Sequence, residues 1–237
     1  MESFSTGRRI AAWGVHLYTA MGLPLALLAA LALIHGELER FWVLNCVAVF
    51  VDATDGTLAR RVEVRRVVPS FDGRRLDDIV DFITFTFLPV LFLALTEMLP
   101  AGWAWMAAAP LLASGYGFCQ ERAKTEGSFV GFPSYWNIGV LYLWLLHTTP
   151  WANLAVILFF SLLVFVPVHY VYPTKTKLLK PLTVWGGYAW AIAMLALAMN
   201  PSAPWAHTVT VVSLVYPAYY FVLSAVNHVQ QTRASGP

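Results

Sequence analysis

The sequence has few charged residues and almost no cysteine. Only 12% of its 237 residues are Asp, Glu, Lys or Arg, whereas 59% are hydrophobic. Soluble domains average about 25% charged and about 45–50% apolar residues. The net charge of +2 is too small and too dispersed to indicate nucleic-acid binding. Cys46 and Cys119 have no paired spacing, which excludes a disulfide framework and a cysteine-based zinc site. This composition predicts an integral membrane protein with a single membrane domain over residues 1–237.

Long apolar runs indicate how the chain crosses the membrane. A membrane-spanning helix needs about 20 mostly apolar residues. The first run is too long for a signal peptide, so it is expected to remain as the first helix. The runs predict an all-α protein with about eight spans, at roughly 10–35, 41–60, 77–98, 101–120, 134–149, 151–171, 182–199 and 204–228.

The basic residues indicate the orientation of these spans. With a cytoplasmic N-terminus, 14 of the 15 Lys and Arg residues fall on the cytoplasmic side and only Arg40 falls outside. This asymmetry follows the positive-inside rule and predicts that both termini are cytoplasmic. The cytoplasmic set comprises Arg8, Arg9, Arg60, Arg61, Arg65, Arg66, Arg74, Arg75, Arg122, Lys124, Lys175, Lys177, Lys180 and Arg233.

Acidic side chains interrupt two of the apolar segments. Asp52 and Asp55 lie within the second expected span, and Asp77, Asp78 and Asp81 open the third. Asp52 and Asp55 share one helix face because they are three residues apart, and Asp77 and Asp81 share one because they are four apart. At 1.5 Å per residue, Asp52 is about 12 Å from the cytoplasmic end of its helix. Two antiparallel helices should therefore present four carboxylates at similar depth near the cytoplasmic face.

Carboxylates in the membrane are costly, which makes these residues candidates for function. Four of them in one place would repel each other unless cations neutralise them. Mg²⁺ and Mn²⁺ prefer such oxygen ligands. Two ions would polarise a diphosphate and stabilise both the attacking and the leaving oxygen. A carboxylate not fully committed to metal would serve as general base.

Small residues accompany both pairs of aspartates. Gly56 and Ala59 lie on roughly the same face as the first pair, and Gly73 lies one turn before the second. Small side chains leave room for a flat ligand to reach the backbone, or let two helices pack closely. The pattern alone leaves both explanations open.

Together these residues form a signature that resembles the CDP-alcohol phosphotransferase family. All eight fixed positions are present in register, as Asp52-x-x-Asp55-Gly56-x-x-Ala59-Arg60 and then Gly73-x-x-x-Asp77-x-x-x-Asp81. The twelve residues between Arg60 and Gly73 form a longer spacer than in most members. This spacer, the eight spans and several flanking segments resemble the bacterial phosphatidylcholine synthase branch. The flanking segments are Phe71-Asp72-Gly73, Leu76-Asp77-Asp78-Ile79-Val80-Asp81, Pro133-Ser134-Tyr135-Trp136-Asn137 and Tyr172-Pro173-Thr174.

The resemblance implies a fold, a reaction and a location. The fold would be the six-helix core of the family plus two C-terminal helices at about 182–228. The reaction would transfer the phosphatidyl group of CDP-diacylglycerol to choline and release CMP. The enzyme would lie in the bacterial inner membrane as a homodimer, with its active site near the cytoplasmic face.

The resemblance also implies roles for the residues of the signature, 52–81. Asp52, Asp55 and Asp77 match metal ligands for Mn²⁺ or Mg²⁺. Asp81 matches the base that removes the choline hydroxyl proton, with a further contact to metal. The donor-nucleotide positions are Asp52, Gly56, Ala59, Arg60 and Gly73. No residue can be assigned to choline, because ten Trp and ten Tyr offer too many aromatic candidates.

Other functions remain as alternatives. Relatives with the same signature use serine, glycerol phosphate or inositol phosphate, so the acceptor rests on the branch-like features alone. A membrane prenyltransferase would have two aspartate-rich motifs far apart in sequence, whereas this chain has one cluster. A cation- or proton-coupled transporter would place its site near the midplane in broken or repeated helices. We therefore expect a phosphatidyltransferase.

Overall fold

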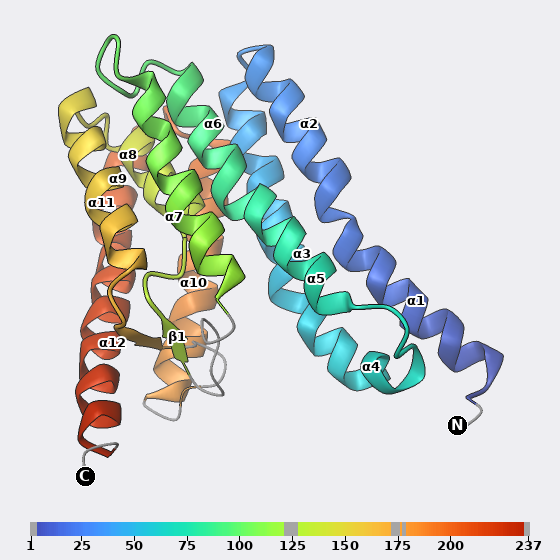
Figure 1. The fold of residues 1–237 in the computed structure, drawn as a ribbon. Coiled ribbons are helices and arrows are strands. Elements are labelled where there is room, and N and C mark those ends of the chain that lie inside the picture. Colours follow the sequence, from blue (N-terminus) through green and yellow to red (C-terminus); the bar gives the residue numbers. More distant parts are fainter. Residues whose placement is uncertain (1–3, 121–127, 172–175, 177–178, 235–237) are drawn as a thin grey trace. The chain divides into compact units, whose positions relative to one another are not determined.

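The computed structural model describes residues 4–120, 128–171, 176 and 179–234. Within this range the chain is mostly helical (Figure 1). It divides into two compact units, Met1–Leu88 and Pro89–Pro237. The aspartates and small residues of the signature all lie in the first unit.

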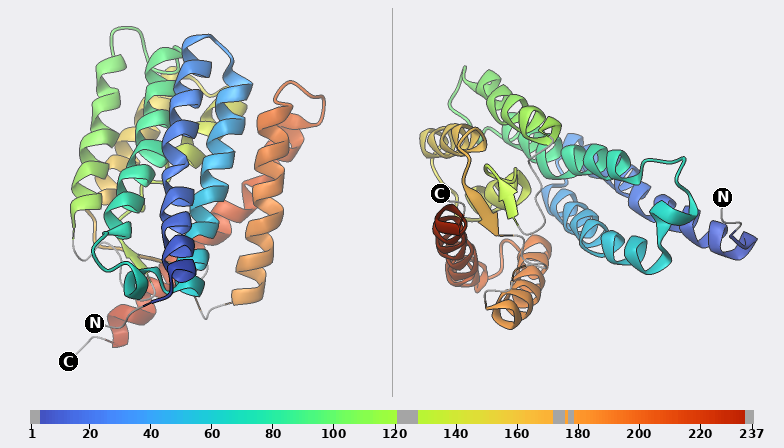
Figure 2. Two further views of the ribbon diagram at one scale, coloured as in Figure 1. Left: turned by 90° about the vertical axis from the view of Figure 1, so that its right-hand side faces the viewer. Right: turned by 60° about the horizontal axis from the view of Figure 1, so that its bottom comes forward.

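A long helical hairpin forms most of the first unit. Helices α1 (Thr6–Ala20) and α2 (Gly22–Ile34) follow one another almost without interruption and lie along α3 (Leu38–Val62), as Figures 1 and 2 show. The short break between α1 and α2 has a local cause. The ring of Pro24 would clash with the carbonyl four residues earlier, at Ala20, where α1 ends.

A compact turn connects α3 to the next long helix. The turn contains α4 (Val64–Val67) and leads to α5 (Gly73–Asp81). The carboxylate of Asp72 accepts hydrogen bonds from the first backbone N–H groups of α5 and so caps this helix. A π-helical segment, η1 (Phe82–Phe87), and α6 (Leu88–Leu95) continue in the same direction.

The second unit contains shorter helices and two long ones. The long helices α10 (Lys180–Met199) and α12 (Val215–Ala234) lie side by side (Figure 2). Its elements after α6 are η2 (Ala104–Ala107), α7 (Ala108–Cys119), β1 (Ser128–Val130), α8 (Trp136–Leu145), α9 (Pro150–Val164), β2 (His169–Val171), α10 (Lys180–Met199), α11 (Ala206–Ser213) and α12 (Val215–Ala234).

The expected span 151–171 is wrong over its last seven residues. Helix α9 ends at Val164, and β2 pairs antiparallel with β1, with His169 opposite Val130. Pro167 explains this ending, since it lacks a backbone N–H and its ring would clash with the last turn of a longer helix. The two strands form a small sheet that the apolar pattern does not predict.

The helix lengths confirm an all-α, multi-pass membrane protein. Five described segments are long and apolar enough to span, and they coincide with the first, second, third, seventh and eighth expected spans. They are Thr6–Ile34, Leu38–Val62, Gly73–Leu95, Lys180–Met199 and Ala206–Arg233.

The other three expected spans form shorter helices. With 10 residues, α8 is about 15 Å long, roughly half the thickness of the hydrocarbon layer. The count of eight spans therefore stays a prediction. Some of the expected cytoplasmic residues and one flanking segment lie outside the described residues, namely Arg122, Lys124, Lys175, Lys177 and the segment 172–174.

Candidate metal centre and active site

Three of the predicted metal ligands converge in the first unit. Asp52 and Asp55 come from α3 and Asp77 comes from α5. One carboxylate oxygen from each lies within 4.8 Å of the others. Asp55 is buried, and the other two are half-buried. The helical spacing therefore predicted the convergence of three of the four expected aspartates.

The geometry and chemistry of this group fit a hard divalent cation. Two oxygens bound to the same Mg²⁺ ion are at most about 4.2 Å apart, so small side-chain rotations would bring the observed group to bonding distance. Three carboxylates so close together also repel one another, and a bound cation relieves that repulsion. Mg²⁺ and Mn²⁺ accept such an all-oxygen ligand set.

The fourth aspartate, Asp81, is not a member of this three-residue group. It is the last residue of α5, one turn after Asp77, and one of its carboxylate oxygens is buried. Among the described residues, the cluster that could hold a metal comprises Asp52, Asp55 and Asp77. The predicted roles of Asp81 as a metal contact and as the base therefore stay predictions.

The backbone changes its winding directly after Asp81. Residues Phe82–Phe87 form the π-helical segment η1, a rare conformation that occurs frequently at functional sites. The side chain of Asn45 on α3, itself buried, donates a 2.9 Å hydrogen bond to the backbone carbonyl of Thr84. Asn45 thus ties η1 to the helix that carries Asp52 and Asp55.

Helix α1 also contributes polar contacts at this site. The Thr19 hydroxyl donates a 2.7 Å hydrogen bond to Oδ2 of Asp55, and both side chains are buried. One residue earlier, the Tyr18 hydroxyl lies 2.8 Å from the Thr54 hydroxyl of α3. A predicted metal ligand is therefore held by a helix outside the signature segment.

The small residues near Asp55 have different surroundings. Among the described residues, a Cβ atom added at Gly56 would meet the Arg60 guanidinium, at 3.3 Å. Arg60 is exposed and donates a 3.0 Å hydrogen bond to the Thr57 hydroxyl. Ala59 instead packs, half-buried, against a hydrophobic cluster whose buried members are Ala12, Val15, Val64, Val67 and Val68.

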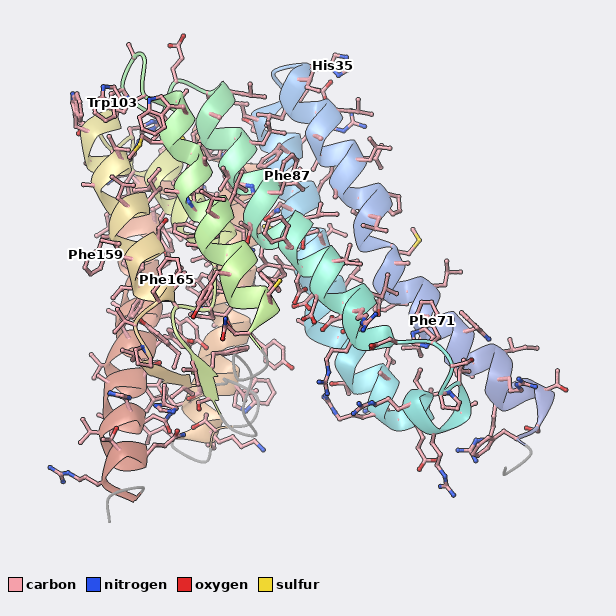
Figure 3. All side chains as sticks on the ribbon, in the orientation of Figure 1. His35, Phe71, Phe87, Trp103, Phe159 and Phe165 are labelled. Carbon is pink, nitrogen blue, oxygen red and sulfur yellow. The ribbon has the colours of Figure 1, made fainter. Side chains whose placement is uncertain are left out.

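Gly73 lies directly beneath the imidazole of His16 on α1. A Cβ atom at this position would be 2.7 Å from Cε1 and 3.1 Å from Nδ1 of His16. The buried His16 ring also packs against Phe71, at 4.4 Å between ring centroids. Phe71 lies on the turn before α5, next to α1 (Figure 3). Close helix packing is thus one reason for a glycine here, while its role beside the nucleotide stays a prediction.

This contact leads to a testable expectation for Gly73→Ala. The new methyl group would clash with His16 and push the start of α5 away from α1, which would move Asp77 relative to Asp52 and Asp55. Because a misplacement of about 1 Å can cost about 100-fold in rate, we expect a loss of that order in the phosphatidyl transfer that the signature predicts.

The double variant His16→Ala/Gly73→Ala provides the control, measured by the same assay in isolated membranes. It should recover a large part of the activity, because the smaller side chain at residue 16 makes room for the methyl group. If the double variant is as impaired as Gly73→Ala alone, the glycine serves another purpose, such as direct contact with the nucleotide.

The sequence pattern did not single out Thr19, His16 or Asn45. Each is one polar residue within a long apolar run and forms no periodic motif. Their importance depends on contacts with residues 36 to 57 positions away, which only the fold reveals. The available signal was that polar side chains inside apolar spans usually face other helices rather than lipid.

Comparison with known proteins identifies the relatives of this chain, although no family model matches it. Phosphatidylcholine synthase from Pseudomonas aeruginosa is 37% identical over 194 residues, which cover 81% of this chain and 82% of the relative. The phosphatidylcholine synthase of Legionella pneumophila is 36% identical and that of Rhizobium johnstonii is 33% identical. These matches cover 83% and 91% of this chain, and 81% and 89% of the relatives. Similarity at this level and over this length shows that the chain belongs to the phosphatidylcholine synthase family.

Proposed function

We propose that this protein transfers the phosphatidyl group of CDP-diacylglycerol to choline and releases CMP, with a requirement for Mn²⁺ or Mg²⁺. The observation that carries the proposal is the group formed by Asp52, Asp55 and Asp77, whose carboxylate oxygens lie within 4.8 Å of one another. It occurs in a chain that shares 33–37% identity with phosphatidylcholine synthases over most of its length. The group supplies the reaction chemistry, and the relatives' names favour choline over serine or glycerol phosphate.

Each aspartate has a role in this proposal. Asp52, Asp55 and Asp77 would hold the divalent cations, and two such ions, when bound, would polarise the diphosphate of the donor. Asp81 would accept the proton of the choline hydroxyl, which is a weak nucleophile without a base. The choline oxygen then forms a bond to the lipid-bearing phosphorus, and the bond from that phosphorus to the CMP oxygen breaks.

The signature residues around the aspartates would bind the donor. Gly56 has no side chain, so a flat ligand would approach the backbone of α3 there, beside the exposed Arg60 guanidinium, which lies 3.3 Å from the position of a Cβ atom at Gly56. An arginine there suits the phosphate of a nucleotide. We assign Ala59 and Gly73 to the edge of the same pocket by their place in the signature.

The proposal includes a location and an assembly. The site would lie near the cytoplasmic face of a bacterial inner membrane, with both termini cytoplasmic and residues 1–237 acting as one membrane domain in a homodimer. Arg8, at the start of α1, and Glu63, directly after α3, form a 2.6 Å ion pair, so these two helix ends lie together. This supports a single basic end of the first unit on the cytoplasmic side. A soluble acceptor and a donor with its tails in the bilayer would meet at such a surface.

The proposed reaction is tested with membranes from cells that express the chain. Supplied with CDP-diacylglycerol, labelled choline and Mn²⁺, they should produce labelled phosphatidylcholine, and chelation should stop it. Serine and glycerol phosphate should not support CMP release. CMP release with one of these alcohols, but not with choline, would keep the reaction type and overturn the acceptor. Absence of CMP release with every alcohol would overturn the transferase and favour a transporter.

A further inference from the structure

We propose that Thr19 is a positioning residue that holds the carboxylate of Asp55 in the orientation needed to bind a divalent cation. The inference rests on the proposed function for its choice of cation. Thr19 lies on α1, well outside the signature segment 52–81. Neither the motif nor the comparisons assign it a role.

The contact itself is short and buried. Thr19 is 8% exposed and Asp55 is 6% exposed, and the hydroxyl oxygen lies 2.7 Å from Oδ2 of the carboxylate. A hydrogen bond to a carboxylate is among the stronger ones that a hydroxyl can make. A carboxylate has two oxygens with about four acceptor sites, so Asp55 can accept this hydrogen bond and still bind a cation.

The surroundings fix the hydroxyl in place. Threonine is branched at Cβ, so its side chain has few rotamers on a helix. The adjacent Tyr18 binds Thr54 of α3, and His16, one turn earlier on α1, packs over Gly73 of α5. Helix α1 is therefore attached to both helices that carry the carboxylate group, and Thr19 faces the group from a constrained position.

Holding a metal ligand in this way has a known consequence. Side chains that hydrogen-bond to metal ligands orient them, and their loss typically weakens metal binding about 10- to 100-fold. Without the Thr19 hydroxyl, Asp55 could rotate, and the cation would have to reorder it on binding. The loss of the hydroxyl should therefore weaken metal binding and should not slow the chemical step at saturating metal.

The test compares two substitutions at Thr19 with one neighbouring control. Thr19→Val removes the hydroxyl and keeps the shape, Thr19→Ser keeps the hydroxyl, and Tyr18→Phe removes the adjacent α1–α3 contact without touching Asp55. Binding of Mn²⁺ to the purified protein in detergent is followed by the electron paramagnetic resonance signal of free Mn²⁺. The Mn²⁺ concentration that gives half-maximal phosphatidyl transfer is measured in parallel.

We expect Thr19→Val to weaken Mn²⁺ binding about 10-fold or more and to regain most of the wild-type rate at saturating Mn²⁺. Thr19→Ser should bind Mn²⁺ within about 2-fold of wild type. Tyr18→Phe keeps the Thr19–Asp55 hydrogen bond, so it should weaken Mn²⁺ binding much less than Thr19→Val does. If Thr19→Val does not fold, Thr19→Ala removes the same hydroxyl and should give the same weakening. Wild-type Mn²⁺ affinity in a folded variant without the hydroxyl, or equal weakening in Thr19→Ser, would overturn the proposal.

The binding measurement separates this inference from the proposed function. If the wild-type protein binds Mn²⁺ but makes no phosphatidylcholine, the reaction is wrong, and the contrast between Thr19→Val and Thr19→Ser still decides the role of Thr19. If the wild-type protein does not bind Mn²⁺, the positioning role is overturned together with the metal site.

Discussion

Replacing Asp81 with asparagine is expected to abolish phosphatidyl transfer while leaving Mn²⁺ and CMP bound nearly as in the wild type. Asp81 lies one turn after Asp77 on α5, and the cluster formed by Asp52, Asp55 and Asp77 does not include it. An amide has the size of the carboxylate but cannot accept the choline proton. General bases typically contribute 10²- to 10⁴-fold to a rate, so we expect a loss of at least about 100-fold.

The matched control for this prediction is Asp78→Asn. Asp78 is a half-buried aspartate of the same helix that is not a fixed position of the signature. The Asp78→Asn variant should therefore retain most of the phosphatidyl transfer activity. Turnover is measured as CMP release in both variants, and Mn²⁺ and CMP binding are measured on the same preparations. Activity close to wild type in Asp81→Asn would exclude Asp81 as the base, whereas loss of Mn²⁺ binding would make it a metal ligand instead.

Asp52→Asn is expected to remove a ligand and so to weaken Mn²⁺ binding and Mn²⁺-dependent CMP binding together. Loss of a residue that only supports a ligand costs about 10- to 100-fold in metal affinity, so loss of the ligand itself should cost about 100-fold or more. The remaining two carboxylates would hold a cation less well, and the nucleotide would lose the charge that attracts its phosphates.

Asp72→Asn serves as the control for the Asp52 substitution. It removes a carboxylate from the same region, yet asparagine caps helices as well as aspartate does, so α5 should begin where it does now. Equilibrium binding of labelled CMP, titrated with Mn²⁺, should distinguish the two variants. Unchanged Mn²⁺ dependence in Asp52→Asn would remove this residue from the metal site.

Spacing along the helices predicted the convergence of Asp52, Asp55 and Asp77. Residues three or four apart share a helix face, and a short connection brings the next helix back alongside. These local rules do not depend on the rest of the fold. They also predicted the five long helices, because the length of an apolar run is a direct measure of its capacity to span a bilayer.

The contacts of α1 could not be predicted in this way. The hydrogen bond from Thr19 to Asp55 joins residues 36 positions apart, and it depends on how α1 is rotated against α3. An apolar run predicts that a helix forms, but the rotation of that helix about its axis is determined by packing against its neighbours. The contact of His16 with Gly73 also depends on the rotation of α1. Gly73 was expected beside a ligand, and the structure shows that it also packs against the His16 ring.

The end of α9 was mispredicted for a different reason. The residues from Phe165 to Val171 are mostly apolar, and hydropathy alone extends the helix through them. Pro167 was the local signal that the helix stops earlier. The following strand, β2, forms only because β1 supplies its partner from about 40 residues away, and no periodic pattern marks so short a pair.

We propose that Asp52, Asp55 and Asp77 bind the divalent cations that activate the donor. The most direct measurement is the anomalous X-ray scattering of crystals grown with Mn²⁺ and CMP. Anomalous peaks are expected between α3 and α5, within coordination distance of all three carboxylates, and they should be lost in Asp52→Asn crystals. Mn²⁺ bound elsewhere, with these carboxylates left outside its coordination sphere, would contradict this proposal.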